Sequence, residues 1–101
     1  MKSDRGSPRP YLIKESKQYR RDVRRLSKSG FSLEKLNKVI DALAAGKTLA
    51  VEYDDHALQG NMAGIRECHV GSDWLLLYQR DEEQLVLLLI GTGTHAKMFG
   101  E

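Results

Sequence analysis

The spacing of apolar residues in this 101-residue chain changes at Gly46. Before Gly46, apolar residues recur every three or four positions, which is the spacing of an amphipathic helix. After Gly46 they form short continuous runs bounded by polar turns, and such runs are typical of buried strands. The chain length suits one domain around one core. A helical first half followed by a strand-rich second half therefore predicts an α+β fold.

Two helices are predicted in the first half. The first is expected over residues 14–28, ending near Gly30. Its apolar face consists of Tyr19, Val23 and Leu26. The second helix has Ser32 at its N-cap position and a continuous apolar stripe. This stripe consists of Leu33, Leu36, Val39, Ile40, Leu43 and Ala44. The short link between the helices favours an antiparallel hairpin that packs on a sheet.

Three strands are predicted in the second half. They cover residues 65–70, 74–78 and 85–90. Short polar turns at residues 71–73 and 80–83 separate them, so they are expected to form an antiparallel meander.

The remaining segments complete the predicted order. Residues 11–13 are β-prone and are expected to add a strand before the first helix, giving the order β-α-α-β-β-β. Residues 46–64 are expected to be mostly loop, with a brief strand at 49–53. Residues 1–10 are expected to be a flexible tail, and residues 11–101 a single domain.

The composition points to a reducing compartment. The single cysteine, Cys68, cannot form an internal disulfide, and no run of about 18 apolar residues is available to span a membrane. The N-terminal residues also lack the apolar stretch of a secretory signal. We therefore expect a cytoplasmic protein that does not associate with membranes.

The net charge of +2 conceals an asymmetry between the two parts of the chain. Residues 1–30 carry ten Lys or Arg against three Asp or Glu, whereas residues 31–101 carry six against eleven. The apolar seam of the first helix is flanked by Arg20, Arg21, Arg24 and Arg25. Such a surface suits a nucleic-acid backbone. A charge run is also typical of a solvated helix face with intramolecular salt bridges, so this pattern leaves both interpretations open.

All three histidines lie in the second half, each beside a turn or strand end: His56, His69 and His95. The predicted meander brings them toward one end of the sheet, together with Asp73. Histidine exchanges protons near neutral pH, so such a group suggests acid–base chemistry. Taken singly, a histidine in such a place is more often a hydrogen-bonded structural residue than a catalytic one. Their spacings of thirteen and twenty-six residues match no compact zinc motif, and we predict no metal or other cofactor.

Grouped imidazoles, a carboxylate, an arginine and an aromatic ring are what metal-free RNA cleavage requires. A base activates the 2′-hydroxyl, an acid protonates the leaving 5′-oxygen, and a cation stabilises the charge on the phosphorane. Phe99 follows His95 by four residues, so the two rings share a face if this segment forms a helical turn. A nucleotide base could stack on that aromatic ring.

Four ordered motifs resemble the YafQ-type toxins of the RelE superfamily. They are Asp55-His-Ala-Leu-Gln-Gly60, Gly64-Ile-Arg-Glu-Cys-His-Val70, Asp73-Trp-Leu-Leu-Leu-Tyr78 and Gly93-Thr-His-Ala-Lys-Met-Phe99. The resemblance covers roughly residues 11–100. It implies a RelE-like fold, in which an N-terminal strand and a two-helix hairpin pack on a small antiparallel sheet. It also implies a toxin of a type II toxin–antitoxin pair, an endoribonuclease that cleaves mRNA in the A site of the 70S ribosome without a metal.

The resemblance also implies site residues. The family's catalytic positions fall on His56, Glu67, His69, Asp73 and His95, with Glu67 standing where relatives often have aspartate. We expect His95 to be the general acid and His69 or His56 the base, with Asp73 orienting an imidazole.

Substrate-binding positions follow in the same way. Arg66 is expected at the scissile phosphate, and Trp74 and Phe99 at the mRNA bases or in the pocket wall. For Trp74, a place in the hairpin core is an equal alternative.

One departure concerns the cation of the site. YafQ-like sequences carry an arginine four residues before the histidine of the last motif, and this chain has Gly91 there. Losing such a preorganised charge commonly costs about a hundredfold or more in rate. Either Arg66 or Lys97 substitutes for it, or the chain is a weakened enzyme or a ribosome- or antitoxin-binding protein without turnover. A third interpretation is a structural module whose histidines only satisfy hydrogen bonds.

The charge asymmetry bears on partners. A basic toxin is expected to bind a small acidic or amphipathic antitoxin of the RelB or DinJ type, which orders as it wraps around the toxin. DNA contact is expected only indirectly, through the antitoxin in the complex.

Overall fold

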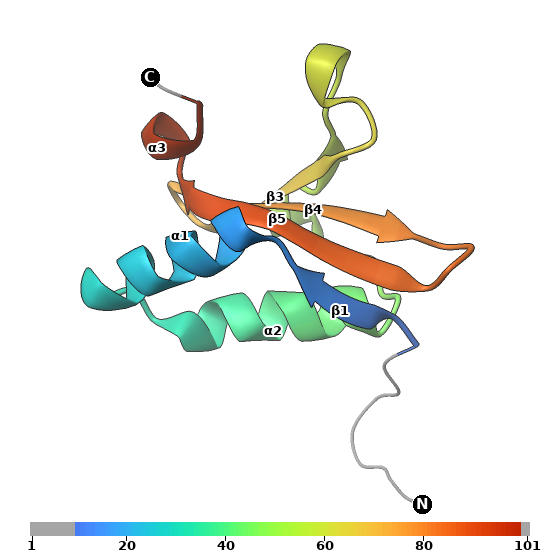
Figure 1. Cartoon of the computed structure of the whole chain (residues 1–101), viewed down its shortest axis with the longest axis horizontal. Coiled ribbons are helices and arrows are strands. Elements are labelled where there is room, and N and C mark those ends of the chain that lie inside the picture. Colours follow the sequence, from blue (N-terminus) through green and yellow to red (C-terminus); the bar gives the residue numbers. More distant parts are fainter. Residues whose placement is uncertain (1–9, 100–101) are drawn as a thin grey trace, which may run out of the picture.

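The computed structural model describes residues 10–99. Their central element is a five-stranded sheet (Figure 1). Its strands are β1 (Leu12–Glu15), β2 (His56–Ala57), β3 (Arg66–Gly71), β4 (Trp74–Asp81) and β5 (Val86–Thr94). The spatial order is β1-β5-β4-β3-β2. β1 runs parallel to β5, and the other neighbours are antiparallel.

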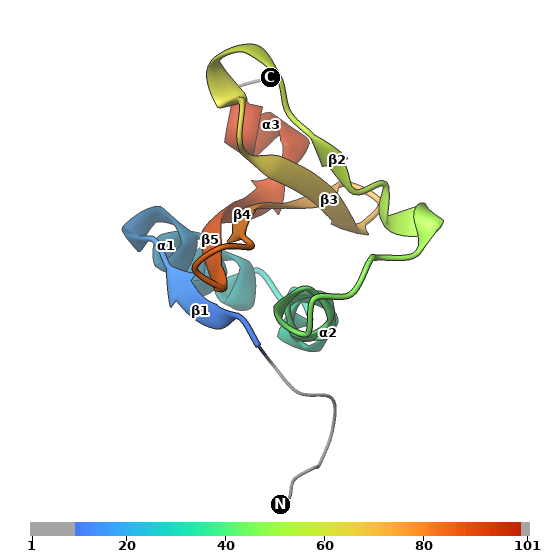
Figure 2. The same ribbon diagram turned by 90° about the vertical axis from the view of Figure 1, so that its right-hand side faces the viewer.

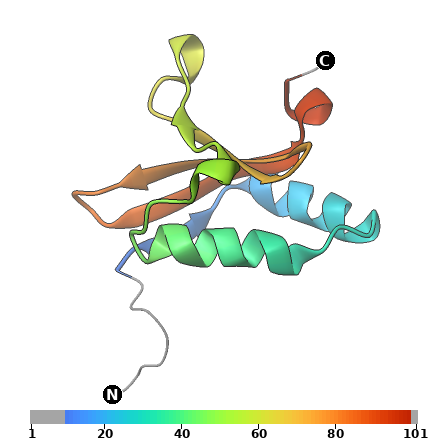
Figure 3. The ribbon, with the colours of Figure 1, turned by 180° about the vertical axis from the view of Figure 1, so that it is seen from behind.

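Helices cover one face of this sheet. Figures 1 and 3 show α1 (Lys17–Lys28) and α2 (Leu33–Ala44) together on one side. Figure 2 shows the short α3 (His95–Phe99) on the opposite side. Two 3-10 helices, η1 (Val51–Tyr53) and η2 (Gly60–Met62), lie in the segment that leads to β3. We call the face turned away from α1 and α2 the site face.

Local signals account for the two long helices. The Ser16 hydroxyl caps α1 by accepting a hydrogen bond from the Tyr19 amide at 2.9 Å. The chain leaves α1 through Gly30, whose positive φ of 86° suits glycine. Ser32 occupies the N-cap position of α2, as expected, although its side chain makes no capping hydrogen bond. The predicted apolar stripe of α2 packs toward the sheet, with Leu43 fully buried.

The core lies between these helices and the sheet. Alternate side chains of a strand point to opposite faces, so one set from each central strand meets the helices. From the strands this set includes Cys68, Leu76, Tyr78, Leu87 and Leu89, all buried. Burial raises the pKa of the Cys68 thiol to about 12, chiefly because a charged thiolate is poorly solvated there.

Where the pairing of β5 with β1 ends, the N-cap residue of α1 and a side chain of α1 form hydrogen bonds with the backbone of β5. The Ser16 hydroxyl donates to the Ile90 carbonyl at 2.7 Å. Farther along, Oδ2 of Asp22 accepts the Thr92 amide at 3.0 Å. Asp22 is only 4% exposed, and its other oxygen accepts hydrogen bonds from Gln18 and Arg25. An acidic residue is therefore buried in an otherwise basic helix because it satisfies a strand edge.

Most predicted elements are confirmed. The α+β class, the helical hairpin, the three-strand meander and the N-terminal strand are all present. The predicted strand at residues 49–53 is wrong, because this segment forms η1 and pairing with β3 begins at His56 instead. The resemblance implied an antiparallel sheet. The observed sheet is mixed, because β1 pairs with β5 in parallel.

Two further expectations concern the N-terminal tail and membrane-spanning segments. The flexible tail predicted at residues 1–10 lies outside them, apart from Pro10. None of the helices in the described part of the chain has the length and apolarity that crossing a membrane requires.

Cys68 is expected to resist alkylation in the folded protein. Its raised pKa means that folding favours the thiol, so its contribution to stability is full below the unfolded value and is lost as pH rises toward about 12. Iodoacetamide at pH 8, followed by mass spectrometry, should label Cys68 only after denaturation. Equal labelling rates in the native and denatured protein would contradict this burial.

Asp22→Ala is expected to lower the free energy of unfolding by about 1–3 kcal/mol, because it leaves the buried Thr92 amide without an acceptor. Asp22→Asn retains an oxygen acceptor and should lose less. Urea denaturation followed by circular dichroism measures both. Equal losses would show that the carboxylate charge, and not the bond to Thr92, is what stabilises this edge.

Candidate active site

Strand register places the predicted residues on the site face in two rows. In the first row, Glu67 pairs with His56 on one side and Leu77 on the other, and Leu77 pairs with Gly91. In the second row, His69 pairs with Leu75, which pairs with Gly93. Paired residues of neighbouring strands point to the same face. Two histidines and a carboxylate therefore share one face, opposite the core.

A bulge in β5 decides on which face Gly91 lies. Tyr78 pairs with Leu89 and Leu77 pairs with Gly91, so Ile90 is an extra residue between the two pairs. Without this bulge, strict alternation would place Gly91 on the same face as Leu89, toward the core. The bulge turns Gly91 to the site face.

His56 is held between two oxygen acceptors. Its Nδ1 lies 2.7 Å from the Asp54 carbonyl oxygen, and its Nε2 lies 3.1 Å from Oε1 of Glu67. A carbonyl oxygen only accepts, so Nδ1 carries a proton. The opposite ring nitrogen, Nε2, faces the Glu67 carboxylate, whose side chain is 9% exposed. Oxygen atoms therefore lie next to both ring nitrogens of His56.

His69 has a more open environment. Its imidazole is 34% exposed, and Nε2 lies 3.6 Å from Oδ2 of Asp54. Asp54 has a left-handed backbone with φ of 47°, a conformation that Asp tolerates better than most residues. Its carbonyl oxygen contacts His56, and its carboxylate lies near both imidazoles, with Oδ1 3.7 Å from Nδ1 of His56 and Oδ2 3.6 Å from Nε2 of His69. Asp54 was not among the predicted site residues, and its place directly before the first motif is the signal that could have identified it.

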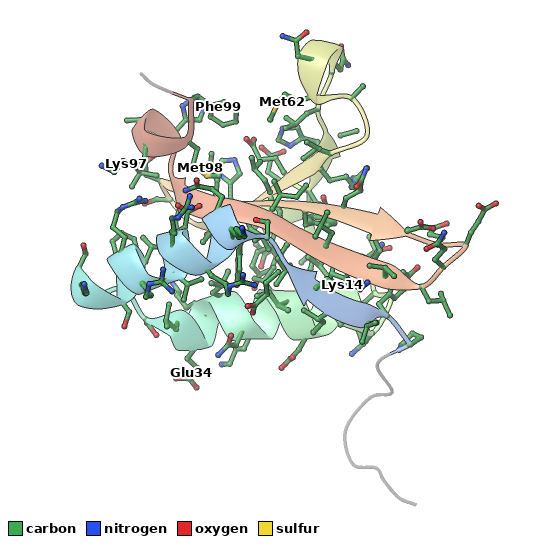
Figure 4. All side chains as sticks on the ribbon, viewed as in Figure 1. Lys14, Glu34, Met62, Lys97, Met98 and Phe99 are labelled. Carbon is green, nitrogen blue, oxygen red and sulfur yellow. The ribbon has the colours of Figure 1, made fainter. Side chains whose placement is uncertain are left out.

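His95 begins α3, immediately after β5. Its ring and that of Phe99 have centroids 4.9 Å apart, as the predicted spacing of four residues requires. Oδ1 of Asp73 accepts a hydrogen bond from the His95 backbone amide at 3.4 Å, so Asp73 helps to position the start of α3. Figure 4 shows Phe99 on α3 and Met62 on η2 at the ends of two projections that rise from the sheet.

Trp74 is a core residue. Its side chain is 5% exposed, its ring meets that of Phe31 edge-on at 5.0 Å, and its Nε1 donates to the Thr92 hydroxyl at 2.9 Å. The expectation that Trp74 contacts mRNA bases does not fit this burial. The alternative, a place in the hairpin core, is correct because Trp74 points to the helix-covered face of β4.

Arg66 lies on the opposite face of β3 from the histidines. It is two residues from buried Cys68, and its guanidinium Nε lies 3.1 Å from Oδ1 of Asp55. The Tyr78 hydroxyl donates to the same carboxylate at 2.7 Å, and burial together with Asp55 raises the pKa of Tyr78. Arg66 is thus part of a structural network, and we do not assign it to the scissile phosphate.

The four arginines of α1 separate into two groups. Arg20 and Arg24 line a shallow groove between α1 and α2, on the side of the sheet away from the histidines. Arg20 donates to the Glu15 carbonyl and Arg21 to the Gln18 side chain, which fits the interpretation of a solvated helix face. Arg25 differs from them, because it lines a pocket together with Gly91 and Lys97.

Among residues 10–99, no three His, Cys, Asp or Glu side chains are grouped so that they could hold a metal ion. The groups on the site face are imidazoles, carboxylates and an aromatic ring. They can donate, accept and position protons near a bound phosphodiester.

Known proteins are similar to this chain in sequence and in fold. A family described as the bacterial toxin of type II toxin–antitoxin systems, YafQ, matches residues 11–100. The mRNA interferase toxin YafQ of Escherichia coli strain K12 is 39% identical over 90 residues, covering 87% of this chain and 95% of that protein. In the crystal structure of the E. coli DinJ–YafQ toxin–antitoxin complex, a chain 36% identical superimposes with a TM-score of 0.83, covering 90% and 99%.

A metal-bound toxin from Helicobacter pylori is also similar, at 39% identity, a TM-score of 0.82, and coverage of 88% of this chain and 99% of that one. The family match spans every strand and helix described above. This chain therefore belongs to the YafQ family of toxins of type II toxin–antitoxin systems.

Proposed function

We propose that this protein is a ribosome-dependent endoribonuclease that cleaves mRNA in the ribosomal A site by acid–base catalysis. The observation that carries the proposal is the grouping of His56, Glu67 and His69 on the site face, with His95 at its end. Membership of a family whose curated relatives are named mRNA interferase supports the same activity.

The chemistry assigns a separate task to each proton-bearing group. His69, beside the Asp54 carboxylate, takes the proton of the 2′-hydroxyl as that oxygen forms a bond to phosphorus. His95 donates a proton to the 5′-oxygen as its bond to phosphorus breaks. His56, held beside Glu67, faces the charge that develops on the phosphoryl oxygens. The products are a 2′,3′-cyclic phosphate and a free 5′-hydroxyl.

The half-buried ring of Phe99 suits a nucleotide base. Phe99 lies beside His95 on α3, with the two rings tilted by 41°, so a base of the codon can pack on its aromatic face while the adjoining phosphate reaches the imidazoles. Phe99 is thus a proposed substrate contact, whereas Trp74 belongs to the core.

The proposed partners follow from the relatives and from charge. A DinJ-like antitoxin is the proposed inhibitor, since YafQ of E. coli forms a complex with DinJ. The ribosome and its mRNA are the proposed targets, in the cytoplasm. Any contact with DNA is proposed to be indirect, through the antitoxin in the complex.

A second candidate is a ribosome-binding protein of the same fold without turnover. Gly91 favours it, because this position lacks the arginine that the family places there. The two candidates differ in whether mRNA is cut, and the following experiment separates them.

His95→Ala is expected to lower cleavage at least about a hundredfold, since it removes the proposed general acid. Primer extension on mRNA in a purified translating system measures the cuts, with and without ribosomes. The matched control is Lys38→Gln, an exposed residue of α2. Ribosome co-sedimentation without cuts in the wild type would establish the binder instead, and cuts that survive His95→Ala would remove His95 from the mechanism.

Gly91→Arg is expected to raise the cleavage rate at least about tenfold by restoring a preorganised cation. A Cβ at this position would lie 3.1 Å from the flexible end of Met98 and 3.3 Å from Oδ2 of Asp22, so an arginine here has a carboxylate beside it. Gly91→Met supplies similar length without charge and serves as the control. An equal rate in wild type and Gly91→Arg would sink the idea that the missing arginine limits this enzyme.

A further inference from the structure

A pocket of about 450 Å³ adjoins Gly91 between α1, β5 and α3. Arg25 and Asp22 line it from α1, and Lys97 and Met98 line it from α3. Leu77 also lines it, and Leu77 stands between Gly91 and Glu67 in the first row of the site face. The pocket therefore adjoins, at Leu77 and Gly91, the row that also holds His56 and Glu67.

The first row of the site face spans three strands. Neighbouring strands are about 4.8 Å apart, so Glu67 on β3 and Gly91 on β5 are separated by roughly 10 Å. On the α3 side, Lys97 follows His95 by two residues on the same short helix. The pocket therefore lies at the β5 end of this row, beside the helix that carries the proposed acid.

The Asp22 carboxylate holds the Arg25 guanidinium at this pocket. Nη1 of Arg25 lies 3.1 Å from Oδ1 of Asp22, and that carboxylate is itself fixed by the Thr92 amide. The Asp22 side chain is 6% exposed whereas that of Arg25 is 46% exposed. One edge of the guanidinium is therefore anchored, and its remaining N–H groups are available on the open side.

Asp22 stands where a side chain at position 91 would begin. Its Oδ2 lies 3.3 Å from a Cβ built on Gly91. A side chain at position 91 would therefore start beside the same carboxylate that holds Arg25.

We propose that Arg25, with Lys97, binds the phosphate next to the cleaved bond and supplies in this chain the positive charge that position 91 lacks. The inference rests on the proposed ribonuclease function and names the substrate contacts of that site. Guanidinium groups suit phosphate because their parallel N–H donors match two phosphate oxygens. Asp22 acts through Arg25 and is a positioning residue.

Arg25→Gln is expected to lower kcat for ribosome-dependent mRNA cleavage about tenfold or more, with a smaller change in KM, because the charge is needed most in the transition state. Lys97→Gln should lower it in the same direction, and Lys97 is exposed, so this variant tests the proposal even if Arg25→Gln folds poorly. Lys38→Gln removes one charge from α2 and is the control. Thermal unfolding of each variant verifies the fold.

A double-mutant cycle tests whether Arg25 replaces the arginine at position 91. Arg25→Gln should cost about tenfold in the chain with Gly91, but less than about threefold once Gly91→Arg is present. Equal costs in the two backgrounds would overturn the inference, as would rates for Arg25→Gln and Lys97→Gln that match the Lys38→Gln control. Absence of His95-dependent cuts in the wild type would instead refute the proposed function itself.

Discussion

The hydrogen bond between the buried Asp22 carboxylate and the Thr92 amide links the fold of this protein to its site. β1 pairs with β5 only as far as Leu89, so the rest of that strand edge needs other partners. Asp22 supplies one of them, and it fixes α1 against the end of β5. The same carboxylate lies beside Gly91 and holds Arg25. A single buried charge thus completes the sheet and arranges the pocket next to the site face.

The pleat of the sheet directs alternate side chains either to the core or to the site face. On β3, Cys68 points to the helices while Glu67 and His69 point to the site face. The side chains toward the helices form the core, and those on the other face include the imidazole of His69 and the carboxylate of Glu67. Trp74 and Arg66 both belong to the structural side, in the core and in the Asp55 network respectively. Neighbouring residues of one motif therefore lie either in the core or on the site face, depending on which side of the strand they occupy.

The three histidines differ in their surroundings although they share a residue type. His56 lies between a carbonyl and a buried carboxylate, His69 beside the exposed carboxylate of Asp54, and His95 against an aromatic ring. The three imidazoles therefore have different hydrogen-bonding and packing partners. The proposed reaction uses this difference, because it needs a separate base and acid.

The sequence by itself determined most of the helices and strands, and it named the histidines and the carboxylate that the structure groups on one face. Apolar spacing was enough for α1, α2 and the meander, because each depends on periodicity within a short segment. The motifs were enough to nominate the histidines and Phe99. The tertiary structure alone decided that β1 joins β5 in parallel, that the bulge at Ile90 turns Gly91 to the site face, and that Arg25 shares its pocket. These depend on pairing register and on contacts between residues far apart in the chain, and local periodicity carries no information about either.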